Sequence, residues 1–225
     1  MVIITGASKG VGKYLFDKMS ACFDVEGTYY STECKNISNM HKVNVSDYDS
    51  VQSFYHTIEN KIKDIVLINC AGVTYTAYTH KSDPKLWKNV VEVNLIGSYN
   101  MIRTFLPAMR EQNYGRIINF SSVVTVYPTP GVSAYAASKS ALIGLTKTLA
   151  VENGSKGIST NIINLGYVNI GMGENNVPQE YKSKLFDQIP MKRFCYPEEI
   201  YNTIEYLINT EYVNGSIIDI NGGLV

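Results

Sequence analysis

The sequence predicts an α/β fold, in which a doubly wound parallel sheet of seven strands carries helices on both faces. Short apolar segments alternate with longer segments of helical periodicity throughout the chain, and this alternation is typical of parallel sheets. The first apolar segment runs directly into a glycine-rich turn. Because no repeat, low-complexity segment or linker interrupts the pattern, residues 1–225 are predicted to form one domain.

The predicted elements follow from local patterns in chain order. Runs of apolar and β-branched residues predict seven strands, at residues 2–5, 24–30, 41–45, 64–72, 115–122, 159–166 and 215–223. Apolar residues at helical spacing predict six helices, at residues 13–23, 51–62, 84–109, 133–152, 178–188 and 197–209. Asp83 and Pro84 suit the start of the third helix. Between the second and third strands, "STECKNISNM" is too short for a helix with its connections, so a loop or a single turn is expected there.

Composition and charge narrow the functional classes. Lys plus Arg and Asp plus Glu both number 20, so the net charge is zero and no basic stripe favours nucleic acid. The apolar runs are shorter than the roughly 18 residues of a membrane span, and the glycine turn follows the start too closely for a signal peptide. The four cysteines lack the spacing of a metal site. We therefore expect a cytoplasmic protein with reduced thiols, no metal and a small-molecule substrate.

The turn after the first strand, "TGASKGVG" at residues 5–12, is typical of a diphosphate site. Glycines allow the backbone to approach the phosphates, and the N-terminus of the following helix offers free N–H groups and a partial positive charge. A tight turn without a ligand is the alternative. The position of the turn, between the first strand and the first helix, favours the diphosphate.

Two pairs of Tyr and Lys stand four residues apart, Tyr14 with Lys18 and Tyr135 with Lys139. Residues at this spacing share one face of a helix. The reference pKa of a tyrosine hydroxyl is near ~10, and a neighbouring ammonium favours the phenolate, so such a pair can serve as general acid or base. Tyr14 and Lys18 lie within the first predicted helix and are interpreted as a surface or packing pair. The other pair follows Ser122, which stands at the end of a buried strand.

The glycine turn, "NCAG" at residues 69–72 and the pair of Tyr135 and Lys139 together resemble the short-chain dehydrogenase/reductase family. The segments "PMKRFCYPEEI" and "NGSIIDINGG" are especially similar to its 3-oxoacyl-[acyl-carrier-protein] reductases. The resemblance covers nearly the whole chain, with the motifs in the expected order. It implies a Rossmann-type fold and hydride transfer between NAD(P)(H) and a carbonyl or alcohol substrate, and we expect a ketone or 3-oxoacyl thioester reductase.

The resemblance also implies roles for individual residues. Tyr135 would exchange a proton with the substrate oxygen, and Ser122 would hydrogen-bond that oxygen; Ser121 is its rival, and the spacing to the tyrosine favours Ser122. Lys139 would hold the nicotinamide ribose. Asn94 would support a water-linked proton relay, with a polar helix residue bonded to the backbone as the alternative. The positions that match cofactor contacts of the family are Gly6, Ser8, Lys9, Gly10, Val11, Gly12, Tyr29, Asn44, Val45, Asn69, Ala71, Gly72, Tyr135, Lys139, Gly166 and Val168.

The chain departs from the family pattern at four positions. Cys70 replaces the second Asn of the segment before Ala-Gly, and Asn44 stands where an Asp usually faces adenine. Leu165 replaces the Pro after the sixth strand. Ile170 replaces a Thr whose hydroxyl binds the nicotinamide amide, so backbone groups around Val168 are expected to serve instead.

The choice between NADP and NAD is predicted from the end of the second strand. NAD-selective relatives carry an acid there, which accepts from the ribose 2′-hydroxyl and repels a 2′-phosphate. Tyr29 occupies that position and Tyr30 follows, so neither the acid nor the arginine of many NADP users is present. Lys9 is the candidate cation for the phosphate, with a solvated lysine as the alternative and Glu33 as an opposing charge. On this balance we expect NADP(H), with NAD(H) as the second choice.

Two other functions are kept as alternatives. The first is a nucleotide-sugar epimerase or dehydratase, which also uses Tyr and Lys but is usually longer. The second is a non-catalytic nucleotide-binding protein, against which the intact catalytic residues argue.

The surroundings of the site and the assembly are predicted more coarsely. Residues 170–190 are expected to cover the site, with Gly171 and Gly173 as hinges, and Tyr127 and Tyr167 are candidates for its lining. In relatives, the helices that begin near residues 84 and 133 form the subunit interface. Apolar residues of the second of these helices, such as Leu142 and Leu145, exceed what one sheet face would cover, so a homotetramer or dimer is expected.

Overall fold

The computed structural model describes residues 1–32, 37–172 and 179–224, and within them seven parallel strands form one sheet, as predicted. The strand order is β3-β2-β1-β4-β5-β6-β7. The strands are β1 (Val2–Ile4), β2 (Val25–Tyr29), β3 (Met40–Lys42), β4 (Val66–Asn69), β5 (Gly115–Ser122), β6 (Ile158–Leu165) and β7 (Ile217–Ile220). The predicted loop between β2 and β3 lies partly outside the described residues.

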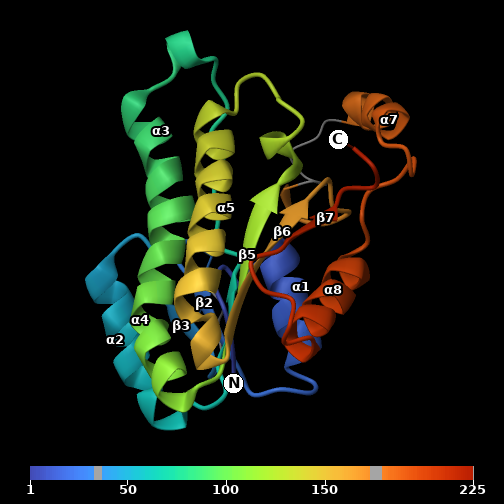
Figure 1. Ribbon diagram of the computed structural model, residues 1–225. Helices are drawn as coiled ribbons and strands as arrows, with labels where there is room; N and C mark the ends of the chain where they lie inside the picture. Colours follow the sequence, from blue (N-terminus) through green and yellow to red (C-terminus); the bar gives the residue numbers. More distant parts are fainter. Residues whose placement is uncertain (33–36, 173–178, 225) are drawn as a thin grey trace.

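Helices cover both faces of the sheet (Figure 1). The helices are α1 (Gly10–Met19), α2 (Tyr48–Ile58), α3 (Pro84–Val91), α4 (Gly97–Gln112), α5 (Ser133–Asn153), α7 (Gln179–Gln188) and α8 (Pro197–Asn209). Helices α1 and α8 lie on one face, and α2, α4 and α5 lie on the other (Figure 1). Within the described residues, no helix combines the length and the apolar character that crossing a bilayer requires.

Two hydrophobic cores, one on each face, explain why the strand sequences are nearly continuous apolar runs. In β1, Val2 and Ile4 pack toward α1 and α8, whereas Ile3 packs toward α2 and α4. All three side chains are buried, because a parallel sheet covered on both faces leaves no solvent-facing side.

The single helix predicted at residues 84–109 is divided in the structure. Helix α3 starts as predicted, with Pro84 in its first turn and the Asp83 carboxylate accepting from the Lys85 N–H at 2.7 Å. A π-helical turn, Glu92–Ile96, separates α3 from α4. A π-turn adds one residue to a helical turn without breaking the helix, so the apolar periodicity of the sequence does not reveal it.

The expectation that Leu142 would remain uncovered is wrong, and Leu145 is covered in part. Leu142 is buried, and Leu145 packs against the core formed by α2, α4 and the sheet. Helix α5 lies beside α4 on the same face of the sheet and packs on β5 and β6 (Figure 1), so this chain covers Leu142 fully and Leu145 in part.

The order of the strands brings the predicted motifs together. Strand β1 pairs with β2 on one side and with β4 on the other. The connections therefore run in opposite directions on the two sides of β1, so the strand order reverses between β1 and β4. The carboxyl ends of the strands at such a reversal form the crevice in which α/β sheets bind their ligands.

Candidate active site

The glycine turn packs backbone to backbone against the segment after β4. A Cβ atom on Gly6, which has a φ of 66°, would lie 2.8 Å from the Ala71 Cα atom. A Cβ on Gly12 would lie 2.4 Å from the Gly6 carbonyl oxygen. Thr5 fixes the approach, because its hydroxyl accepts from the Cys70 and Ala71 N–H groups at 3.0 and 2.9 Å. Larger residues would fill the space that this cradle leaves.

The N-terminus of α1 completes the cradle. Lys9 is the residue before the helix, and its side chain makes no capping hydrogen bond. The first turn carries no acidic residue. The N–H groups of this turn and the positive end of the helix dipole therefore suit an anion. These features fit the diphosphate of a dinucleotide, and Ser8, Gly10 and Val11 lie in the same turn.

The predicted adenosine contacts lie at the carboxyl ends of β2 and β3. Tyr29 ends β2 and is partly buried, and its carbonyl oxygen accepts from the Val43 N–H at 2.8 Å. The Asn44 side-chain oxygen accepts from the Ser46 hydroxyl at 2.8 Å, so it is used within its own loop. Val45 is buried, and its carbonyl accepts from Asn100 on α4. Val45 therefore anchors the loop, which leaves Asn44 and Tyr29 nearer the surface.

Ser122, Tyr135 and Lys139 come together where β5 meets the start of α5. The Ser122 side chain hydrogen-bonds to Tyr135. The Lys139 ammonium lies 5.6 Å from the centroid of the Tyr135 ring and donates to the Phe120 carbonyl at 2.7 Å. The Ser121 hydroxyl instead donates to the Lys139 carbonyl at 3.1 Å and is buried. Of the two serines, it is Ser122 that contacts the tyrosine.

Burial sets the electrostatics of this group. It raises the pKa of Tyr135, whereas the hydrogen bond from Ser122 acts in the opposite direction. Burial also lowers the pKa of Lys139 to about 8, and the neighbouring Cys70 partly opposes that effect. The Cys70 thiol has its pKa raised to about 11, again by burial. At neutral pH the thiol is therefore protonated and the lysine is a cation beside Tyr135.

Asn94 lies in the π-turn and is fully buried. Its side-chain amide donates to the Val73 carbonyl at 3.0 Å and to the Ser138 hydroxyl at 3.1 Å, and its oxygen accepts from the Val73 N–H at 2.8 Å. The side chain thus bonds to backbone, as in the alternative considered above, and ties the segment after β4 to α5. Its backbone carbonyl accepts from the Ser98 hydroxyl at 2.9 Å. A role of Asn94 in a water-linked proton relay stays a prediction.

The other predicted contacts are structural neighbours of these groups. The Asn69 amide donates to the Asn119 oxygen at 2.9 Å beneath the site. A Cβ on Gly72 would lie 3.4 Å from the Asn94 side-chain oxygen and 3.8 Å from the Lys139 ammonium. A Cβ on Gly166 would lie 2.8 Å from the Asn221 Cα atom, so this glycine allows the chain to leave β6 close to the end of β7.

The second Tyr–Lys pair lies away from the catalytic group. On the surface of α1, the Tyr14 hydroxyl bonds to the Glu198 carboxylate of α8, and Lys18 pairs with the same carboxylate at 3.1 Å. The hydrogen bond to Glu198 is the main cause that raises the pKa of Tyr14 to about 12. These residues join two helices, in agreement with their interpretation as a surface pair.

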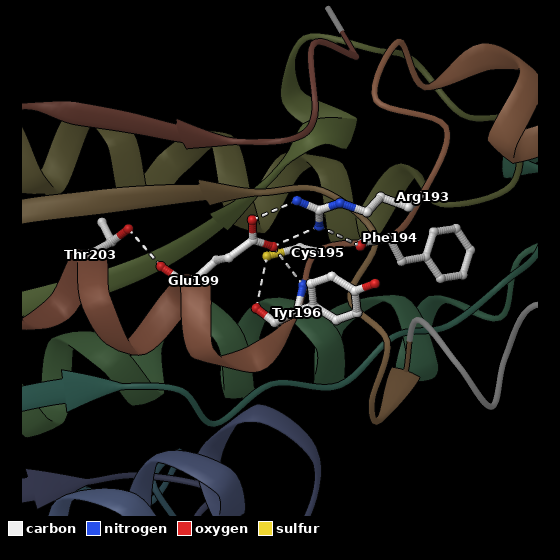
Figure 2. A network of polar contacts seen from close by, with 6 residues as sticks. All are labelled: Arg193, Phe194, Cys195, Tyr196, Glu199 and Thr203. Atoms are coloured by element: carbon white, nitrogen blue, oxygen red, sulfur yellow. Dashed lines mark hydrogen bonds and ion pairs between the residues drawn. The ribbon is translucent and has the colours of Figure 1, made fainter.

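A polar network at the start of α8 was not predicted from the sequence. The Arg193 guanidinium donates to both carboxylate oxygens of Glu199, at 2.8 and 2.7 Å (Figure 2). Glu199 also accepts from the Tyr196 N–H at 2.8 Å, and its pairing with Arg193 lowers its pKa to about 2. The local signal for this arrangement is Glu199 itself, which stands three residues after Tyr196, the N-cap residue of α8, as in a capping box.

An apolar cluster adjoins Ser122 at the end of β5. Val123 follows Ser122 directly, and the Tyr167 ring stacks on Phe194 with centroids 5.5 Å apart. The cluster comprises Val123, Ile189, Phe194 and Leu224, with Tyr127, Tyr167, Leu185 and Phe186 packed against it. Both tyrosines that were predicted to line the site thus belong to one apolar cluster that includes α7.

Comparisons with known proteins identify the family of the chain. A model of the short chain dehydrogenase family matches residues 1–181. The chain is 34% identical to the 3-oxoacyl-[acyl-carrier-protein] reductase FabG of Thermotoga maritima, over 99% of this chain and 96% of the relative. It is 37% identical to nodulation protein G of Azospirillum brasilense, over 80% of this chain and 74% of the relative. The crystal structure of a 3-oxoacyl-[acyl-carrier protein] reductase from Brucella melitensis matches with a TM-score of 0.88 and 30% identity, covering 99% of this chain and 90% of that chain. The chain therefore belongs to the short-chain dehydrogenase family and is an oxidoreductase.

Proposed function

We propose that the protein is an NADP(H)-dependent carbonyl reductase whose substrate is a 3-oxoacyl thioester. One observation carries the proposal: Ser122, Tyr135 and Lys139 converge at the carboxyl end of β5, next to the glycine cradle. The names of the similar reductases support the thioester as the substrate class. The apolar cluster that begins at Val123 suits an acyl chain.

Each residue of the group has a defined part in reducing a carbonyl. When bound, the nicotinamide supplies the hydride. The Tyr135 hydroxyl donates its proton to the carbonyl oxygen as negative charge develops there. The Ser122 hydroxyl donates a hydrogen bond to the same oxygen. The Lys139 ammonium stabilises the tyrosinate that remains, because the two lie together in a buried site.

The cradle residues would hold the cofactor by its phosphates. The N–H groups at the start of α1 face the position of the diphosphate, and Tyr29 at the end of β2 presents no carboxylate to a 2′-phosphate. Lys9 is exposed beside the same turn and is the cation that we assign to that phosphate. Glu33, the opposing charge considered above, lies outside the described residues.

A nucleotide-sugar epimerase is the weaker candidate. The similar proteins that the chain matches over nearly its whole length are named as 3-oxoacyl reductases. A non-catalytic role is also weaker, because it would not explain why the Lys139 ammonium is buried at a cost in desolvation free energy.

The proposal is tested with the purified protein, NADPH or NADH, and a panel of short 3-oxoacyl thioesters and simple ketones, followed by nicotinamide absorbance. We expect kcat/KM to be highest for a 3-oxoacyl thioester with NADPH. Lys9→Glu should lower kcat/KM for NADPH by about tenfold and leave that for NADH nearly unchanged, because only the first carries a 2′-phosphate. A native preference for NADH, or an unchanged variant, would contradict the cofactor assignment. Inactivity toward every carbonyl compound would contradict the reaction.

A further inference from the structure

The loop after β6 touches the glycine turn through two glycines. A Cβ atom on Gly171 would lie 2.9 Å from the Gly10 Cα atom, and a Cβ on Gly10 would lie 3.3 Å from the Gly171 Cα atom. Both residues are left-handed, with φ angles of 66° and 56°. Neither a side chain nor an ordinary backbone conformation is therefore compatible with this contact.

Hydrogen bonds to Cys195 hold the loop in place. Val168 and Cys195 form a parallel bridge, in which the Cys195 N–H donates to the Tyr167 carbonyl at 2.8 Å and the Asn169 N–H donates to the Cys195 carbonyl at 3.0 Å. The loop is thus fixed three residues before Gly171, and its path toward the glycine turn starts from a defined point.

The network of Figure 2 fixes Cys195 in turn. The residues on either side of Cys195 are bound to it: Arg193 pairs with Glu199 and donates to the Phe194 carbonyl at 3.1 Å, and the Tyr196 N–H donates to Glu199 at 2.8 Å. Since Glu199 lies in the first turn of α8, this helix carries the bridge. The charge-assisted bonds of a bidentate Arg–carboxylate pair make this support geometrically specific.

Ile170, the residue before Gly171, packs against the core shared by α1 and α8. Its side chain therefore anchors the loop to this core. Because isoleucine has no hydroxyl, it cannot make the hydrogen bond of the Thr that the family pattern has at this position. What the loop can present to a cofactor at this point is its backbone.

We propose that Gly171 is a cofactor-positioning residue, whose contact with Gly10 sets the loop after β6 at the distance from the glycine turn at which its backbone holds the cofactor. The contact compensates for the missing Thr hydroxyl, and the network on α8 keeps the loop in register. This inference rests on the nicotinamide site of the proposed function and concerns how tightly that site binds.

The direct test is the dissociation constant of NADPH, measured by fluorescence titration, for Gly171→Ala. The added Cβ meets the glycine turn, so we expect the Kd to rise about five- to tenfold, equivalent to the loss of one or two hydrogen bonds. Gly144→Ala is the matched control, because a Cβ at that position of α5 meets no atom within 4 Å. Its Kd should equal that of the wild type.

Two further variants separate the contact from general destabilisation. Asn tolerates a left-handed backbone better than Ala but also carries a Cβ, so Gly171→Asn should weaken NADPH binding as Gly171→Ala does. Glu199→Gln weakens the support of Cys195 without touching the turn, and it should raise the Kd in the same direction by a smaller factor. In all three variants, the KM for NADPH should rise more than kcat falls. Thermal unfolding identifies any variant that is not folded at the assay temperature.

Unchanged NADPH binding in folded Gly171→Ala and Gly171→Asn would overturn the inference. Tighter binding would overturn it too, since the contact would then obstruct the site. The proposed function fails separately: a wild-type protein that binds neither NADPH nor NADH would contradict the nicotinamide site itself.

Discussion

At the scale of single residues, the two Tyr–Lys pairs show that neighbours decide what a spacing means. Tyr14 bonds to a carboxylate, which raises its pKa to about 12 and disfavours loss of its proton. Burial raises the pKa of Tyr135 as well, but its hydrogen bond to Ser122 acts in the opposite direction, and the Lys139 ammonium lies 5.6 Å from the centroid of its ring. Only the partners, which come from distant parts of the chain, distinguish the proposed proton donor from the surface residue.

The pKa of Lys139 predicts how cofactor use depends on pH. Since burial lowers this pKa to about 8, the lysine loses its proton above that pH and no longer stabilises the tyrosinate. We expect kcat/KM for NADPH to be constant below about pH 7, to fall to roughly half near pH 8 and to decline further above it. The measurement is the pH profile of carbonyl reduction at limiting NADPH.

Lys139→Arg is the informative comparison for this profile. A guanidinium stays charged throughout the range, so the alkaline decline should move to higher pH even where the rate is reduced. A wild-type profile that remains flat to about pH 10 would show that the charge of Lys139 does not control the reaction.

At the scale of elements, the sequence predicts which helices and strands exist better than it predicts where each of them begins and ends. The start of α3 follows from Asp83 and Pro84, which act locally. The π-turn contains Asn94, which bonds to Val73 after β4 and to Ser138 on α5. These partners are 21 and 44 residues away in the sequence, so no local pattern indicates that the helix predicted at residues 84–109 is interrupted.

The packing of α4 on α2 gives a prediction about stability. Phe105 on α4 is fully buried, and its ring lies 5.9 Å from that of Phe54 and 5.3 Å from that of Tyr55, both on α2. Phe105→Ala should lower the free energy of unfolding by about 3–5 kcal/mol, because it removes contacts and leaves a cavity. Urea denaturation measures this loss.

Phe23→Ala provides the comparison, since Phe23 is 39% exposed and lies outside both cores. Its effect should stay below about 1 kcal/mol. Equal losses in the two variants would mean that α4 does not pack on α2 as described.

At the scale of the whole molecule, alternation of strands and helices was enough to predict the sheet, because every parallel strand needs a crossover. The position of the glycine turn was also predictable, since it directly follows β1. The pair of Tyr135 and Lys139 was found from its spacing and from the family resemblance, and its catalytic role stays a prediction. The network of Arg193 and Glu199 was not predictable from the sequence. Its contribution depends on the bridge between the loop after β6 and the residues before α8, which are far apart in the chain. The burial of Leu142 likewise depends on how α5 lies against the sheet.

The surface of the molecule supports the expectation of a homodimer or homotetramer. Four large apolar side chains in the region of α3, α4 and α5 are at least 41% exposed. They are Leu86 on α3, Ile96 in the π-turn, Tyr99 on α4 and Val151 on α5. Covering them with a second copy would remove apolar surface from water. Light scattering at micromolar concentration should give a multiple of the chain mass of 25.1 kDa, and Tyr99→Glu should shift the mass downward. A wild-type mass of one chain would contradict the assembly.

The most direct test of the account compares Tyr135→Phe with Tyr14→Phe in the reduction of a 3-oxoacyl thioester by NADPH. Each variant removes one hydroxyl group, but only the first removes the proposed proton donor. For Tyr135→Phe, we expect turnover to fall by about two to four orders of magnitude, with the Kd of NADPH within about twofold of the wild type. Tyr14→Phe should keep nearly full turnover. Near-normal turnover in Tyr135→Phe would contradict the assignment of Tyr135 as the proton donor and, with it, the catalytic group built on β5 and α5.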